Sequence, residues 1–378
     1  MSSICRICES RIEAPDFRAP APAMTSLSTL IAAETEVGVC PGCGHVQSPD
    51  LPDVQAFYDR EYRISLQSDD HDQLYEQRDG STVFRTDRQA ELVLELDLPE
   101  GARILDFGAA KAATLKKVVD ARPDLEPHVF DVSRDYCPHW DGWIAADNQA
   151  TYDLPERWAG RFDVITAHFV LEHIADPVAV FETLRRCLAP KGRLFFTVPD
   201  PLANPGDLLV VDHLNHFTEP SLRAALSRAG FGTMDFRAEG FRGAHVVVAR
   251  PGPGDETDGS PAVAECVTSV RAALAGWGGM LEGIARAEVA GRRVAIYGAG
   301  FYGTLIASRL GEKPVCFLDR NPHLQGQTHL GCPVLTPEAC PDDIEAIFAG
   351  LNPLHARRIL PHSESWIPAG ARLIYLEG

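Results

Sequence analysis

The sequence predicts an α/β protein with a doubly wound, mostly parallel sheet, preceded by a small metal-binding module and followed by a second, similar α/β domain. Three observations support this: two Cys-x2-Cys pairs near the N-terminus, an alternation of short apolar strands and helical stretches over about residues 78–250, and a Gly-x-Gly-x-x-Gly motif beginning at Gly298. A chain of 378 residues has room for two or three domains.

The N-terminal segment, residues 1–75, holds the four paired cysteines: Cys5, Cys8, Cys40 and Cys43. Thiolates paired in this way can surround one tetrahedral Zn(II), and glycines at 42 and 44 suit the tight turns of such knuckles. All four positions would be filled by the protein, which predicts a structural zinc site. The alternative is four unrelated cysteines.

The middle segment, residues 76–250, carries the predicted doubly wound sheet. Strands are expected in "RILDFG", "PHVFDVS", "FDVITAHFV", "GRLFFTVP" and "AHVVVAR", with helices between them. Ligands of such sheets bind at the carboxyl ends of the strands, which places Asp106, Asp131 and His168 on one rim. The turn after the first strand has Gly108, but alanine at 110 and 112. Alanine is tolerated wherever φ is negative, and at a position that needs positive φ it would be strained by about 1 kcal/mol or more.

The C-terminal segment begins after an expected linker over residues 251–262 and continues as a domain over residues 263–378. A helix is expected over about 262–290, followed by a strand, the motif Gly298-x-Gly300-x-x-Gly303, and Asp319 at the end of the next strand. This arrangement is typical of a dinucleotide-binding fingerprint. We weigh a bound dinucleotide against a fold kept for packing, substrate contact or some other nucleotide.

Composition excludes several classes of partner. The formal charge of −18 argues against a general nucleic-acid or anionic membrane surface. No apolar run approaches the roughly 20 residues of a membrane span, and the N-terminus lacks a signal-peptide pattern. We therefore expect a cytoplasmic protein with reduced cysteines; the oligomeric state stays open.

The middle segment resembles the class I S-adenosylmethionine (SAM) dependent methyltransferases, a Rossmann-like fold, through "ILDFGAAKAATL", "VFDVS" and "FDVITAHFVLEHIADP...LRRCLAPKGRLFFTVPD". The resemblance implies SAM at the predicted rim, held by Asp106, Gly108, Ala110 and His168, with Asp131 on the ribose.

The three-part architecture is similar to that of the nucleotide-deoxysugar C-methyltransferases. These enzymes methylate the carbon next to a 4-keto group, which implies a nucleotide-sugar substrate and a base that forms an enolate. In "VVDHLNHF" the resemblance implies His213 as that base, with Asp212 beside it and His216 as a second imidazole. His173 in "VLEHI" would support it, and His173 is also the second candidate for the base. Two family features are changed: Val210 stands where a Tyr is expected, and "GFRGAHVVV" replaces a Gly-Gly-Ser/Thr stretch.

Three alternatives stay open. The chain could methylate oxygen or nitrogen of a sugar or small metabolite, it could bind a sugar nucleotide without catalysis on a degenerate methyltransferase scaffold, or it could be an NAD(P)-dependent oxidoreductase that uses the C-terminal motif.

Overall fold

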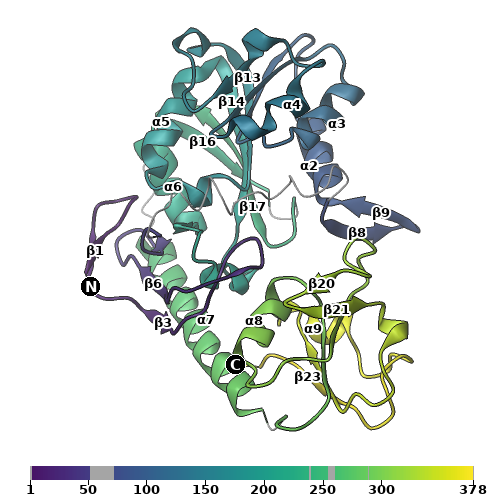
Figure 1. Cartoon of the computed structure of the whole chain (residues 1–378). Coiled ribbons are helices and arrows are strands. Elements are labelled where there is room, and N and C mark those ends of the chain that lie inside the picture. The colour runs from purple at the N-terminus through teal and green to yellow at the C-terminus, as the bar shows by residue number, and fades with distance from the viewer. Residues whose placement is uncertain (1, 52–71, 238–239, 254–259, 288, 378) are drawn as a thin grey trace.

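The computed structural model describes residues 2–51, 72–237, 240–253, 260–287 and 289–377. Figure 1 shows two α/β units, one formed by the middle and one by the C-terminal part of the chain, with the N-terminal strands beside the long helix α7. The predicted fold class is confirmed: a central sheet rich in parallel strands, with a second C-terminal sheet.

The middle segment forms a seven-stranded sheet in the order β12-β11-β10-β13-β14-β17-β16. The first five strands run parallel, and β17 is antiparallel to both of its neighbours, β14 and β16. β16 therefore runs in the same direction as the first five strands. The strands are β10 (Arg103–Phe107), β11 (Glu126–Asp131), β12 (Gln149–Thr151), β13 (Phe162–His168), β14 (Leu188–Pro199), β16 (Phe231–Phe236) and β17 (Ala244–Pro251). Strand order reverses between β10 and β13, and ligands of doubly wound sheets bind at such a switch point.

Helices cover both faces of this sheet because its strands are apolar on both sides. The side chains of Ile104 and Phe195 pack with α2 (Arg85–Leu94), α3 (Ala113–Ala121) and α4 (Cys137–Trp140). Their strand neighbours Leu105 and Phe196 pack on the other side with α5 (Pro177–Cys187) and α6 (Glu219–Arg228). Strand periodicity thus divides the interior into two separate cores.

The N-terminal segment is completed by residues from the middle of the chain. Its sheet has the order β15-β7-β6-β3, with β3 (Phe17–Ala19), β6 (Thr35–Val39), β7 (Val46–Gln47) and β15 (Asn215–His216). Smaller hairpins are β1 (Ser3–Ile4) with β2 (Arg11–Ile12), β4 (Ala23–Met24) with β5 (Leu30–Ile31), and β8 (Leu74–Arg78) with β9 (Ser81–Phe84). The pairing of β15 with β7 joins residues 215–216 to the cysteine-bearing segment.

The C-terminal segment folds into a six-stranded sheet in the order β20-β21-β19-β18-β22-β23. Its strands are β18 (Val294–Tyr297), β19 (Cys316–Leu318), β20 (Thr328–His329), β21 (Cys332–Leu335), β22 (Ala346–Ala349) and β23 (Arg372–Ile374), with helices α8 (Phe301–Arg309) and α9 (Ala356–Ile359). Only the β20–β21 pair is antiparallel among these neighbours.

Helix α7 (Ser260–Arg286) begins near the predicted residue 262 but ends four residues before the predicted 290. It packs on β3, β6 and α8 and shares one apolar core with them, which includes Val37, Trp277 and Ile296. Of the expected linker at 251–262, Pro251 belongs to β17 and the residues from Ser260 belong to α7, while residues 254–259 lie outside the described residues. Among the described helices none is both long and apolar enough to span a membrane.

Candidate functional site

The turn after β10 adopts the left-handed backbone conformation three times. Gly108 has a φ of 73°, and an added Cβ would lie 2.4 Å from the Val170 side chain, so a larger residue does not fit there. Ala110 (φ 45°) and Ala112 (φ 56°) also have positive φ. Both alanines therefore stand at positions of the kind for which strain is expected from the sequence, about 1 kcal/mol for each.

The carboxylate of Asp131, at the end of β11, holds this turn. Its Oδ2 accepts a hydrogen bond from the Ala110 amide at 2.9 Å, and its Oδ1 accepts one from the Ser133 amide at 3.0 Å. Burial raises the pKa of Asp131. Each carboxylate oxygen keeps a second lone pair, so the group can still accept a ligand hydroxyl.

Asp106 lies beneath the same turn rather than at its surface. The side chain is buried and its Oδ1 accepts a hydrogen bond from Thr166 Oγ1 at 2.8 Å. Burial raises its pKa to about 7. Asp106 and Asp131 come from the adjacent strands β10 and β11, as the strand order predicted from the sequence implies.

His168 ends β13 and is held inside the molecule. Its Nδ1 lies 3.2 Å from Thr197 Oγ1, its Nε2 is buried without a hydrogen-bond partner among the described residues, and burial lowers its pKa to about 3. The next residue, Phe169, has a φ of 56° and lies under the Arg85 guanidinium, 3.7 Å from the ring centroid. His168 is thus a neutral imidazole at physiological pH.

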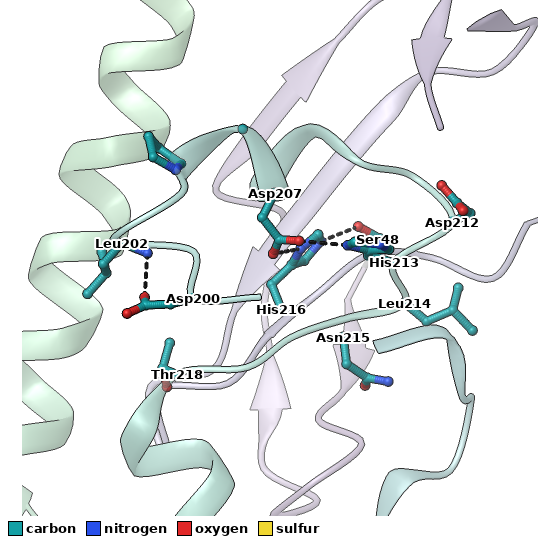
Figure 2. Close-up of polar contacts among 12 residues, drawn as sticks. Ser48, Asp200, Leu202, Asp207, Asp212, His213, Leu214, Asn215, His216 and Thr218 are labelled. Atoms are coloured by element: carbon teal, nitrogen blue, oxygen red, sulfur yellow. Dashed lines mark hydrogen bonds and ion pairs between the residues drawn. The ribbon is translucent and has the colours of Figure 1, made fainter. Parts of the chain in front are cut away.

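Three of the predicted catalytic residues meet around a carboxylate that the sequence analysis did not select. Asp207, in the short helix Pro205–Leu209, accepts hydrogen bonds from His213 Nδ1 at 2.6 Å and from His216 Nδ1 at 2.8 Å (Figure 2). His173 contacts His213 edge-on, with ring centroids 4.7 Å apart. His216 Nε2 continues the network to Ser48 Oγ at 3.0 Å.

The electrostatics of this cluster favour an ion pair between Asp207 and His213. Burial alone would lower the pKa of His213, but the Asp207 charge and hydrogen bond, with smaller contributions from Glu172 and Asp212, raise it to about 9. Burial alone would raise the pKa of Asp207, but His216 and His213 hold it well below its usual value. Burial and the nearby His213 charge lower the pKa of His173 to about 4.

Asp212 does not pair with its neighbour His213. Its carboxylate accepts hydrogen bonds from the Ser26 amide at 2.7 Å and the Ser26 hydroxyl at 2.5 Å, and Figure 2 shows it apart from the Asp207 network. Its backbone carbonyl accepts a hydrogen bond from His173 Nδ1 at 2.9 Å. The carboxylate that pairs with His213 is Asp207, six residues earlier, so the expected pairing by sequence adjacency is corrected.

Glu172 is a second acid that sequence reasoning missed. It is 1% exposed, and neither carboxylate oxygen has a hydrogen-bond partner among the described residues. Burial raises its pKa to about 7. Glu172, His173 and His213 each place a polar atom within 4.8 Å of the others. The sequence signal was the acid beside His173 in "LEHI".

The four N-terminal cysteines converge as their spacing predicts. Cys5 Sγ lies 3.7 Å from Cys43 Sγ, Cys8 Sγ lies 3.4 Å from Cys40 Sγ, and all four sulfurs lie within 4.8 Å of one another. Sulfurs about 2.3 Å from a central zinc would be about 3.8 Å apart. Amides of residues 7 and 42 approach sulfurs of the pairs at 3.4 Å, so the donor set fits a Zn(II) ion.

The C-terminal glycine motif is used in close packing. A Cβ on Gly303 would lie 1.9 Å from the Gly298 carbonyl oxygen, and one on Gly298 would lie 2.4 Å from the Gly350 oxygen. Asp319 Oδ2 accepts a hydrogen bond from the Ala299 amide at 2.8 Å, as Asp131 does in the first turn. Strand, turn, helix and acid therefore lie where the fingerprint predicts.

Comparison with known proteins identifies the middle of the chain. Residues 83–234 match the family model of a methyltransferase domain. The ubiquinone biosynthesis O-methyltransferase of Xanthomonas axonopodis pv. citri (strain 306) is 33% identical over 105 residues, 26% of this chain and 44% of the relative. The protein of the same name from Xanthomonas oryzae pv. oryzae (strain PXO99A) is 34% identical over 108 residues, 27% of this chain and 44% of the relative. The match therefore spans less than half the length of these relatives.

Two solved methyltransferase structures show a partial likeness. The CurJ carbon methyltransferase is 17% identical with a TM-score of 0.37, covering 44% of this chain and 55% of that chain. Human N-acetylserotonin methyltransferase in complex with SAM is 21% identical with a TM-score of 0.36, covering 43% and 52%. Likenesses this weak do not bear on the substrate. By its family model, the chain contains a methyltransferase domain.

Proposed function

We propose that this chain is a SAM-dependent methyltransferase that methylates a carbon next to the keto group of a nucleotide-activated deoxysugar. The observation that carries the proposal is the buried Asp207–His213 pair, with hydrogen bonds of 2.6 Å and 2.8 Å from Asp207 to two imidazoles, in a chain that contains a methyltransferase domain. The proposed base is His213.

SAM would supply the methyl group, and the turn after β10 would hold it. Asp131 would accept hydrogen bonds from the ribose hydroxyls, because its carboxylate is fixed by two backbone amides at the end of β11. The adjacent Val132 is 61% exposed and would give an apolar surface for the adenine ring. Asp106, Gly108 and Ala110 would shape the turn, and His168 would line the rim from β13.

His213 would remove the proton from the carbon next to the ketone. A base with a pKa of about 9 is strong enough to assist this weak carbon acid, although only a small fraction of it is deprotonated at pH 7. Once protonated, the imidazole is stabilised by the Asp207 carboxylate at 2.6 Å. Asp212 would act through its backbone carbonyl, which accepts a hydrogen bond from His173 and orients that ring beside His213. His216 would hold the second carboxylate oxygen of Asp207 by a hydrogen bond.

A second candidate is methylation of a hydroxyl on a small molecule. The relatives from Xanthomonas are named as O-methyltransferases of ubiquinone biosynthesis, and their similarity lies in the methyltransferase domain. His213 could deprotonate a hydroxyl in the same position. The two candidates differ in whether a carbon-bound proton of the substrate is lost.

Exchange in heavy water separates these candidates. The protein is incubated in D2O with a dTDP-4-keto-deoxysugar, first without and then with SAM, and the sugar is analysed by mass spectrometry. C-methylation predicts deuterium uptake next to the ketone before SAM is added, and its loss in His213→Asn but not in the exposed control His362→Asn. A methylated product formed without exchange would favour O-methylation. If the protein catalyses no exchange and forms no methylated product, the proposed substrate class is rejected.

We further propose that Cys5, Cys8, Cys40 and Cys43 hold a structural Zn(II). The paired sulfur distances of 3.4 and 3.7 Å and the buried positions of three of the cysteines support this. Because the protein fills all four positions, the ion would stabilise the N-terminal sheet and would leave no place for substrate. That sheet includes β15, which carries His216.

A further inference from the structure

The C-terminal glycine-rich turn contacts the segment that carries Asp207. Tyr302, at the start of α8, donates a hydrogen bond from its hydroxyl to Asn204 Oδ1 at 2.9 Å and accepts one from the Gly206 amide at 3.2 Å. A phenol has one donor hydrogen, and here that hydrogen is directed at the segment before Asp207. Burial raises the pKa of Tyr302, so the hydroxyl keeps its proton.

A second aromatic residue holds the same segment from α7. Trp277 is fully buried, and its Nε1 donates a hydrogen bond to the Pro205 carbonyl at 2.7 Å. Its ring is roughly parallel to that of Tyr302, with 19° between the planes and 6.3 Å between the centroids. A Cβ on Gly206 would lie 2.7 Å from the Tyr302 hydroxyl, so the backbone fits against the phenol only as glycine.

Asp207 directly follows the segment that Tyr302 and Trp277 contact. Asp207 follows Gly206 in the chain, and its amide donates to the Asn204 carbonyl at 3.0 Å. Its two carboxylate oxygens accept hydrogen bonds from His213 and His216 at 2.6 and 2.8 Å. A shift of the Asp207 backbone by a few tenths of an ångström would lengthen these hydrogen bonds. Residues from the C-terminal part of the chain thus contact the segment that directly precedes the acid of the candidate site.

We propose that Tyr302, with Trp277, is a positioning residue for the Asp207–His213 pair, so that the C-terminal domain completes the catalytic site. This inference rests on the proposed function for its catalytic meaning. The glycines of the motif fit the same role: close packing at Gly298 and Gly303 brings α8 against β18 and places Tyr302 at the helix start.

The test compares Tyr302→Phe with Tyr375→Phe in the full chain. Tyr375 belongs to the same C-terminal domain, but its hydroxyl donates to the Leu360 carbonyl at 2.6 Å, outside the Asp207 segment. The readouts are the titration of His213 by NMR of its ring protons, the rate of substrate deuterium exchange across pH, and SAM affinity by calorimetry. Circular dichroism confirms that each variant is folded.

In Tyr302→Phe we expect the His213 titration midpoint to fall by about one pH unit. We also expect the exchange rate above pH 9, where most of the imidazole is deprotonated in both proteins, to fall about tenfold, because Asp207 no longer holds the imidazole in place. SAM affinity should stay unchanged, and Tyr375→Phe should match the wild type. Asn204→Asp, which keeps an acceptor for the phenol, should retain more exchange activity than Asn204→Leu. The groups facing His213 in this titration are Asp207, Glu172, Asp212, His173 and His216.

An unchanged His213 midpoint in folded Tyr302→Phe would overturn the inference. A wild-type protein that neither exchanges nor methylates the sugar nucleotide would instead reject the proposed substrate, while the NMR titration would still decide whether Tyr302 positions Asp207. The two failures are therefore distinguishable.

Discussion

Replacement of Asp207 by asparagine should remove both the charge and half of the hydrogen-bonding capacity that the buried histidines require. The carboxylate accepts from Nδ1 of His213 and of His216, at 2.6 and 2.8 Å. An amide has one carbonyl oxygen, so one of the two imidazoles would face an N–H donor and would have to change tautomer. The shape of the side chain is otherwise preserved.

The magnitude follows from the pKa of His213. A rise from 6.5 to about 9 corresponds to about 3 kcal/mol of preference for the protonated imidazole in the folded state. Because the folded pKa is the higher one, this stabilisation is complete below pH 6.5 and is lost as the pH rises through 9. The pKa of Asp207 lies well below its usual value, so Asp207 itself does not titrate in this window.

We therefore expect Asp207→Asn to lower the free energy of unfolding by about 3 kcal/mol at pH 6.5 and by much less at pH 9.5. Urea denaturation at both pH values measures this difference, and NMR titration of His213 should show a midpoint well below 9. Asp176→Asn is the matched control, because Asp176 caps α5 through the Ala179 amide and asparagine caps equally well.

The reasoning would be refuted by an Asp207→Asn protein whose stability depends on pH as the wild type does. If that variant does not fold, His216→Asn gives a second route, because it removes only one of the two hydrogen bonds to Asp207. His213 should then still titrate well above 6.5.

Four further outcomes are expected. Cys40→Ser should abolish binding of about one zinc per chain, measured by metal analysis, and retained zinc would contradict the four-sulfur site. Asp131→Asn should weaken SAM binding about tenfold or more in calorimetry, through loss of charge-assisted hydrogen bonds, and an unchanged affinity would exclude the ribose contact. Ala110→Gly should raise the free energy of unfolding by up to about 1 kcal/mol in urea, by relieving strain at φ 45°; a loss of stability would argue against the left-handed turn. The deuterium exchange rate should rise about tenfold per pH unit from pH 7 towards 9, as His213 loses its proton, and a flat profile would exclude it as the base.

Patterns local in the sequence predicted the fold well. The alternation of strands and helices placed the strands of the central sheet, and the fingerprint placed the β18–α8 turn with Asp319 at the next strand end. The Cys-x2-Cys pairs brought four sulfurs together. These features depend on periodicity and short-range geometry, which the sequence displays directly.

The pairing of the acid and the imidazole could not be predicted in this way. Sequence adjacency favoured Asp212, but the chain turns between residues 210 and 213, so the Asp212 carboxylate meets Ser26 while His213 meets Asp207. A carboxylate pairs with the donors that lie nearest to it in space. For Asp212 those donors depend on how the N-terminal segment packs against the turn at residues 210–213.

The sequence by itself determined the α/β class, the cysteine cluster and the rim where Asp106 and Asp131 lie, because each follows from strand order and spacing. Only the tertiary structure decided the strain at Ala110 and the burial of the Glu172 carboxylate without a hydrogen-bond partner among the described residues. The same holds for the contacts of Tyr302 and Trp277 with the segment before Asp207. These depend on side chains brought together from distant parts of the chain, and burial gives their charges and hydrogen bonds a strength that sequence position does not reveal.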